Sequence, residues 1–313
     1  MPDHIRKVTL DLQTVTPLFI RGADQNGPPE LRSPAFRGVL RYWYRALLGG
    51  VIGDQNRSEL QRLEALVFGA TDCASSVSIR LHGSPETDMY PILPHKSDSA
   101  RRKAFSPGQN FNLTLQAAPY CDDLVWKNAC MALNLALLLG GFGLRSRRGA
   151  GNLQVIRSSD NDLVPTLPND AGQIQTMIAK IIRSAIDFAK QLASREKVST
   201  VGLPAKPTTF PCAARGASMV YVKNWGDDPT RALASLMQKV PKVKWLGGIT
   251  PRQASPLWAH VFLTNGSRPK YHLLLTVLPS KLKTGDDHVQ LEKWLRGFEG
   301  LGGQKLEIEG WNK

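Results

Sequence analysis

The chain has 313 residues, 42% hydrophobic and 21% charged, a composition typical of folded proteins that argues against global disorder. Forty Lys and Arg against 26 Asp and Glu give a net charge of +14, and both halves of the chain share the excess. A folded chain this basic favours a polyanionic partner, with nucleic acid ahead of an anionic membrane. A basic enzyme with no such partner is the alternative.

Patterns for metal binding and for membrane targeting are both missing from the sequence. The histidines are scattered, no HExxH occurs, and C-x-x-C spacing is absent among Cys73, Cys121, Cys130 and Cys212. The N-terminal residues carry no targeting pattern, and the most apolar run, MALNLALLLGGF, is too short to span a bilayer. These features predict a cytoplasmic protein with reduced thiols, no metal, no cofactor and no membrane contact.

The first half of the chain follows the order β-α-β-β-α-β. Val8, Leu10 and Leu12 alternate with polar residues, which predicts a strand, and Pro34 favours the start of a helix. The predicted elements are a strand over 7–20, a helix over 35–48, strands over 75–83 and 109–118, a helix running from Asp122 through 139, and a strand over 152–157. This order is that of the ferredoxin-like unit.

The second half repeats the order after a connecting segment. A polar, proline-containing stretch over 158–170 precedes an amphipathic helix over 173–193. The elements that follow are a strand over 218–224, a helix over 229–240, strands over 256–264 and 270–278, a helix over 289–298 and a strand over 304–310. The predicted fold class is α+β: two ferredoxin-like (RRM-like, βαββαβ) domains over 1–157 and 201–313, joined by a linker and connecting helix over 158–200.

Residues 84–108 form a long polar stretch that the pattern assigns to a loop, and they include the basic run HKSDSARRK (95–103). Loops of this length are commonly either functional or disordered. Two interpretations stay open. One is a flexible, solvated loop, and the other is a mobile RNA contact made by Lys96, Arg101, Arg102 and Lys103.

The helix over 35–48 separates apolar from cationic side chains. Helical spacing gives it an apolar side that we predict to be core: Phe36, Val39, Leu40, Trp43 and Leu47. Arg37, Arg41 and Arg45 form a cationic row on roughly the opposite side. Arg32 lies just before the helix and could extend this row. Because guanidinium groups in such a row repel one another, a phosphate-facing role is favoured. A solvated basic face, or pairing with distant carboxylates, is the alternative.

Residues 140–155, GGFGLRSRRGAGNLQV, combine five glycines with three arginines. The segment lacks the Lys of a P-loop, and Ser146 stands where a Rossmann motif needs its third glycine. A glycine-rich turn between a helix and a strand can form an anion nest, and its arginines suit a sugar–phosphate backbone. The alternative is a helix C-cap that continues into a turn, with the arginines in solvent. The predicted RNA-facing residues are Gly140, Gly141, Gly143, Arg145, Arg147, Arg148, Gly149 and Gly151.

Several segments, taken in order, resemble one known family. They are TPLFIRGADQ (16–25), ELRSPAFRGVLRYWYRALLGG (30–50), LEALVFGA (63–70), the glycine-rich segment and RQASPLWAHV (252–261). Together they resemble the RAMP superfamily of CRISPR-associated proteins, most closely the family of the first-numbered Cmr subunit of type III-B effector complexes. The resemblance covers most of the chain except 84–108 and the linker.

The resemblance implies a non-catalytic RNA-binding subunit of a Cmr ribonucleoprotein that acts in antiviral defence. Such a subunit contacts RNA near the 3′ end of the guide and helps capture target RNA, so its partners are guide (crRNA) and target RNA and the other RAMP subunits. The residues carried over as RNA-facing are Arg32, Arg37, Arg41, Arg45, the glycine-rich segment and Arg252. The strand QNFNLTLQAA lacks the aromatic RNP1 pattern, so backbone and shape contacts are expected, with the guide supplying sequence specificity.

Two other functions stay open. A metal-independent ribonuclease would need a general base, and the candidates, His4, Asp24, His82 and His95, do not lie beside the glycine-rich segment in sequence. A mainly protein-binding scaffold could use an aromatic surface made by Trp225, Trp245 and Trp258, although core packing also explains them.

Overall fold

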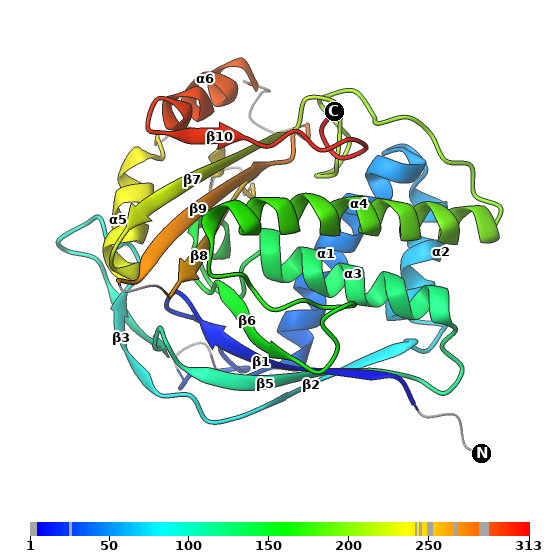
Figure 1. Ribbon diagram of the computed structural model, residues 1–313, viewed down its shortest axis with the longest axis horizontal. Coiled ribbons are helices and arrows are strands. Elements are labelled where there is room, and N and C mark those ends of the chain that lie inside the picture. Colours follow the sequence, from blue (N-terminus) through cyan, green and yellow to red (C-terminus); the bar gives the residue numbers. More distant parts are fainter. Residues whose placement is uncertain are drawn as a thin grey trace.

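The computed structural model of the protein describes residues 5–24, 27–241, 243, 246–248, 253–265, 268–281 and 288–313 (Figure 1). Its first part contains β1 (Lys7–Thr14), α1 (Ser33–Ile52), α2 (Arg57–Phe68), β2 (Val77–His82), β3 (Thr87–Pro91), β4 (Arg101–Phe105), β5 (Asn110–Ala117), α3 (Asp123–Leu139), the 3₁₀ turn η1 (Ser146–Arg148) and β6 (Leu153–Ser158). The second part contains α4 (Ala171–Arg195), β7 (Ser218–Gly226), α5 (Pro229–Lys239), β8 (Leu257–Thr264), β9 (Lys270–Val277), α6 (His288–Glu299) and β10 (Gly303–Lys305).

Two antiparallel four-stranded sheets have the same topology. Their orders are β2-β5-β1-β6 and β10-β7-β9-β8. When each unit's four strands are numbered along the chain, both sheets have the order 4-1-3-2, with helices after the first and third strands. The predicted pair of ferredoxin-like units is therefore confirmed.

The first sheet buries one face against its helices. Val8, Leu10 and Leu12 of β1 are fully buried in the core, while Thr9 and Asp11 between them stay partly exposed. This alternation is what the sequence pattern predicted, because successive strand residues point to opposite faces.

The second sheet is covered on both faces. On β8, Trp258 and Phe262 join the core shared with α1, α3 and α4, whereas Ala259 and Val261 join the core under α5 and α6. Figure 1 shows α3 and α4 between the two sheets, with α5 and α6 on the outer side of the second. The sequences of β8 and β9 are almost continuously apolar because both faces of this sheet are covered.

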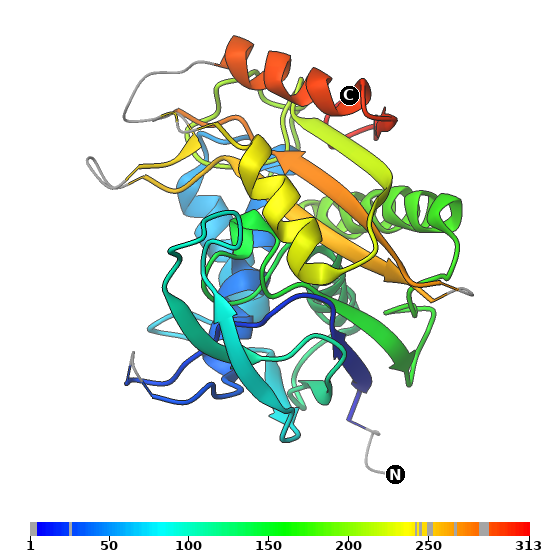
Figure 2. The ribbon, with the colours of Figure 1, turned by 90° about the vertical axis from the view of Figure 1, so that its left-hand side faces the viewer.

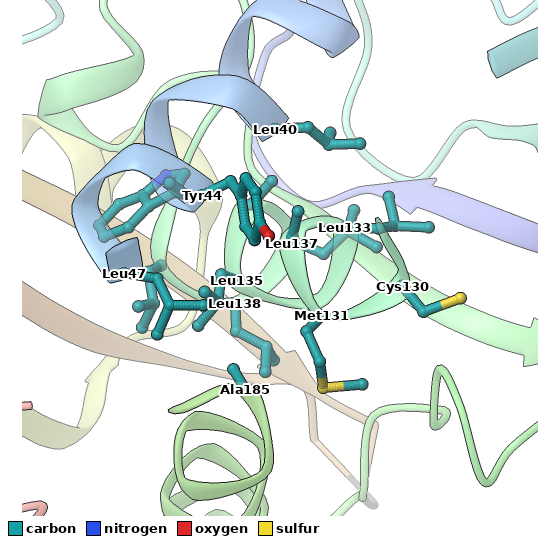
Figure 3. Close-up of a cluster of buried hydrophobic side chains, with 14 of the residues drawn as sticks. Leu40, Tyr44, Leu47, Cys130, Met131, Leu133, Leu135, Leu137, Leu138 and Ala185 are labelled. Carbon is teal, nitrogen blue, oxygen red and sulfur yellow. The ribbon is translucent and has the colours of Figure 1, made fainter. Parts of the chain in front are cut away.

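The connecting helix α4 is a core element. Ile178, Ile182 and Ala185 are buried, and they belong to the same apolar cluster as α1 and α3. Figure 3 shows Ala185 of α4 on the side of that helix that faces the α3 side chains of this cluster. The apolar stripe of α4 therefore packs the helix against the first unit.

Residues 84–108 do not form the loop that their polar pattern predicted. They contain the hairpin β3–β4, and main-chain hydrogen bonds of 3.1 Å join Phe105 with Leu18 in both directions. Phe105 and Ala104 are buried. Figure 2 shows the hairpin beside α5, and Pro91 and Leu233 border the same narrow crevice between them. The sequence pattern did not indicate this hairpin because its buried residues are separated by polar and charged ones.

The ends of the first and last strands, and one helix, also differ from the sequence prediction. The first strand ends at Thr14, six residues earlier than predicted, because Pro17 cannot continue a ladder. The helix α2 was not predicted as an element. The last strand is shorter than expected because the chain turns to bury Ile308 and Trp311. Among the described residues, no helix is long and apolar enough to cross a bilayer.

Candidate nucleic-acid interface

The glycine-rich segment connects α3 to β6. Gly143 and Gly151 have φ of +79° and +67°, in the left-handed region. A backbone carbonyl oxygen also lies against each of these glycines, that of Phe19 at Gly143 and that of Phe142 at Gly151. These two positions therefore need glycine for both conformation and space.

The loop is held against the segment after β1 and against the start of α1. The Leu144 amide donates to the Phe19 carbonyl at 2.8 Å. Phe142 stacks on Phe36 of α1, with ring centroids 4.3 Å apart. The structure thus brings the glycine-rich loop next to the first turn of the arginine-bearing helix.

Arg147 points into the boundary between the two ferredoxin-like units. Its guanidinium donates to the Ser255 carbonyl and lies over the rings of Trp258 (4.7 Å) and Tyr42 (5.1 Å). Trp258 Nε1 donates to the Tyr42 hydroxyl at 2.9 Å, which fixes the two rings. Cation–π attraction and the carbonyl contact therefore tie the loop to α1 and to the segment before β8.

Arg148 binds the same segment from a more buried position. Its guanidinium donates to Ser255 Oγ at 3.0 Å and to the Leu246 carbonyl at 2.8 Å. Burial, with smaller contributions from Arg145 and Arg147, lowers the pKa of Arg148 to about 10. Two of the three loop arginines thus contact the second unit.

Arg145 behaves differently from its neighbours. It is exposed, it has a left-handed backbone with φ of +61°, and no described residue pairs with its guanidinium. Of the three loop arginines, it is the one placed to meet a ligand from solvent.

The arginine row on α1 has a carboxylate partner. Glu64 of α2, whose side chain is 4% exposed, pairs with Arg41 and lies 3.5 Å from Arg45 Nε. Arg37 donates to the Phe68 carbonyl, and burial followed by the charge of Arg41 lowers its pKa. Pairing with a distant carboxylate, one of the open alternatives, therefore holds for two of the three arginines. One carboxylate against three guanidiniums still leaves the face cationic.

Arg32 lies at the start of α1. Its guanidinium donates to the Arg21 carbonyl at 3.4 Å and lies 4.0 Å from Glu30 Oε1. These long contacts leave the side chain 38% exposed, beside the residues that hold the glycine-rich loop.

The basic residues of the β3–β4 hairpin are spread along it. Lys96 is exposed in the connecting turn, and Arg101 donates to the Met89 carbonyl across the hairpin. Arg102 is half-buried and Lys103 is exposed near Arg21, whose guanidinium donates to the Lys103 carbonyl at 3.3 Å. The remaining candidate, Arg252, lies outside the described residues.

Comparison with known sequences places the chain in a family. The RAMP superfamily model matches residues 11–154, which contain the arginine helix and most of the glycine-rich segment. The Cmr subunit Cmr1-2 of Pyrococcus furiosus is 32% identical over 178 residues, covering 46% of this chain and 92% of that protein. The chain belongs to the RAMP superfamily, in its Cmr1 family. Cmr1-1 of the same organism is 31% identical over 150 residues, covering 43% of each chain.

Solved structures share the fold of this Cmr1-family chain. Apo Cmr1 from Pyrococcus furiosus superposes with a TM-score of 0.68 at 20% identity, covering 98% of this chain and 100% of the other. A chain of a type III-B Cmr-beta complex bound to cognate target RNA gives 0.61 at 14% identity, with 94% and 99% covered. At these identities the similarity establishes the fold alone.

A histidine that no sequence pattern indicated packs against the glycine-rich loop. His260 of β8 is buried, and its Nδ1 lies 2.6 Å from the Gly140 carbonyl oxygen, which requires the Nδ1 proton to be donated there. Asn152 also donates to that carbonyl, at 2.9 Å, and accepts from the Val261 amide at 3.0 Å. Burial lowers the pKa of His260 to about 4. No local pattern links residues 120 positions apart.

His260 is expected to make stability depend on pH. The unfolded side chain takes up a proton below about pH 6.5, whereas the folded one stays neutral until about pH 4, so stability falls as pH decreases through this window. The loss from this group approaches about 3 kcal/mol at pH 4. Urea unfolding of wild type and His260→Gln between pH 7 and pH 4 measures it. Between pH 7 and pH 4 the free energy of unfolding should decrease more for the wild type than for His260→Gln. An equal decrease in both proteins would contradict the role given to His260.

The residues considered for catalysis and for a protein-binding surface are separated in the structure. Among the described residues no cluster of His, Cys, Asp and Glu could hold a metal ion. His82 is exposed on β2, His95 lies in the hairpin turn and Asp24 is exposed, whereas His4 lies outside the described residues. Trp258 is buried and Trp225 partly buried in the cores, as the packing interpretation predicted, and Trp245 lies outside the described residues.

Proposed function

We propose that the chain is a non-catalytic, RNA-binding subunit of a type III-B Cmr effector complex in the cytoplasm. It contacts RNA near the 3′ end of the guide and helps capture target RNA, with the other RAMP subunits as its protein partners. The supporting comparison is its 32% identity to a Cmr1 subunit. The residues proposed to face RNA are the exposed cations around α1 and the loop tip, together with Arg252.

The observation that carries the proposal is the surplus of guanidinium groups beside the glycine-rich loop. On α1, Arg41 and Arg45 share Glu64, whereas among the described residues no carboxylate pairs with Arg37 or with Arg145 at the loop tip. Such a surplus costs electrostatic repulsion unless a polyanion neutralises it. His260, the histidine beside the loop, is buried and bound to a carbonyl, so it offers no general base to a substrate.

Reconstitution of the type III-B particle with and without this chain tests the proposal. The particle that lacks it is expected to retain guide RNA and to bind target RNA more weakly, and the full chain alone should show salt-dependent RNA binding. Unchanged target capture would contradict the proposed role. Cleavage of labelled RNA by the purified chain, with or without Mg²⁺, would replace the non-catalytic assignment with a ribonuclease.

A further inference from the structure

Two hollows on the first unit meet at one arginine. A hollow of about 500 Å³ lies between the start of α1, β2 and the end of β5, and a second of about 660 Å³ lies between α1, α2 and the segment after α2. Arg37 and Ser75 line both. We name the pair the α1 groove. Each hollow has the size of an ordinary ligand site, about 300–1,000 Å³.

The lining of the α1 groove combines apolar surface in the first hollow with hydroxyl and guanidinium groups in both. Ser33, Ser75 and Ser78 line the first hollow, and Arg37, Arg41 and the carboxylate of Glu64 lie at the second. Guanidinium and hydroxyl groups are the donors that hold phosphate oxygens in nucleic-acid complexes. Of the five N–H groups of the Arg37 guanidinium, the described residues accept one, through the Phe68 carbonyl. An apolar peptide would leave the others without an acceptor, so the lining at Arg37 favours a phosphodiester chain.

Charge in the groove exceeds what the protein neutralises. Glu64 forms ion pairs with both Arg41 and Arg45, and among the described residues no carboxylate pairs with Arg37. The first turn of α1, which borders the groove, contains no acidic residue and receives no side-chain cap. An anion bound at Arg37 would meet a net positive field from the arginine row and the helix end.

An exposed aromatic ring lies at the rim of the groove. Tyr120 is 63% exposed, and its hydroxyl donates to the carbonyl of Ser75 at 2.8 Å. The preceding residue, Pro119, lines the first hollow. The ring is therefore tethered at its hydroxyl while most of its surface faces solvent. Rigid, exposed rings beside cationic grooves are the stacking platforms of single-strand binding proteins.

We infer that the α1 groove binds a single-stranded segment of RNA, with phosphates at Arg37 and one unstacked base on Tyr120. This inference rests on the proposed RNA-binding function and identifies the form of RNA at a second contact, separate from Arg145 at the loop tip. The segment is single-stranded because a base inside a duplex has no free face for the ring.

The first test separates the ring of Tyr120 from its hydroxyl. Tyr120→Ala should weaken binding of a fluorescein-labelled, mixed-sequence single-stranded RNA by about five- to 150-fold, the range for one lost base stack. Tyr120→Phe keeps the ring and should stay within about twofold of wild type. Fluorescence anisotropy gives the affinities, and thermal unfolding verifies that both variants are folded. An abasic oligonucleotide should remove the difference between Tyr120→Ala and wild type.

The second test counts phosphate contacts. Arg37→Gln should weaken binding and reduce the slope of log K against log salt by about 0.7, the value for one contact to a single strand. Tyr120→Ala should leave that slope unchanged. The matched control is Arg183→Gln, an exposed arginine on α4, which should change neither affinity nor slope.

Cross-linking locates the RNA directly. RNA carrying 4-thiouridine, bound to the full chain alone or in the reconstituted particle, should cross-link to the tryptic peptide over 104–127, which contains Tyr120. If RNA binds but Tyr120→Ala and Arg37→Gln both behave as wild type, the groove inference is wrong and the proposed function stands. If neither the chain nor its particle binds RNA through this subunit, the groove inference and the proposed function are both wrong.

Discussion

Alanine at Gly143 is expected to destabilise the protein by about 2–4 kcal/mol and to weaken RNA binding. Gly143 has φ of +79°, and a methyl group there would collide with the Phe19 carbonyl, with its carbon 2.8 Å from Phe19 C and 3.3 Å from Ile20 N. Both neighbours are backbone atoms, and the same carbonyl accepts the Leu144 amide, so neither side of the contact can move alone. The loop tip that carries Arg145 must therefore move to make room for the methyl group, and this movement is expected to weaken RNA binding.

Gly108 provides the matched control. Its φ is +81°, almost that of Gly143, but nothing lies within 4 Å of the position that a methyl group would take. Gly108→Ala should therefore show the cost of the left-handed backbone alone, about 1 kcal/mol. Urea unfolding of both variants measures the difference, which is the contribution of the close approach. Equal losses would mean that the loop accommodates a side chain at Gly143.

Local chemistry was enough to predict the ferredoxin-like units. Alternation of Val8, Leu10 and Leu12 identified a half-buried strand, and these residues are fully buried. Asp122 was placed at the start of a helix, and its side chain accepts from the Val125 amide as an N-cap. Such signals lie within a few residues of one another, so the sequence alone contains them.

The site depends on contacts that no local pattern contains. The sequence left it open whether the arginine row pairs with a distant carboxylate, because Glu64 lies 23 residues from Arg41, on a helix that was not predicted. Arg147 was expected to face RNA, but its partner Ser255 is 108 residues away. A run of glycines and arginines specifies a flexible cationic loop, while the direction of each arginine depends on the packing of the second unit.

Arg147→Ala is expected to destabilise the protein by about 2–4 kcal/mol. It removes a guanidinium that lies over Trp258 and Tyr42, worth about 0.5–2 kcal/mol at each ring, and it leaves the Ser255 carbonyl without its charged donor. Arg147→Lys keeps the charge but loses the planar stack, so it should fall between wild type and alanine. Denaturant unfolding of the three proteins measures the order.

The neighbouring Arg145 is the control for Arg147, because its loss is expected to affect RNA binding and not stability. Arg145→Ala should leave stability within about 0.5 kcal/mol of wild type, because no described residue pairs with its guanidinium. It should instead flatten the salt dependence of RNA binding by about 0.7. Arg147→Ala should weaken RNA binding without changing that slope, since its guanidinium already contacts protein and neutralises no phosphate. If Arg147→Ala flattens the slope and spares stability, the guanidinium exchanges its protein contacts for RNA on binding. The boundary between the two units would then open when RNA is captured.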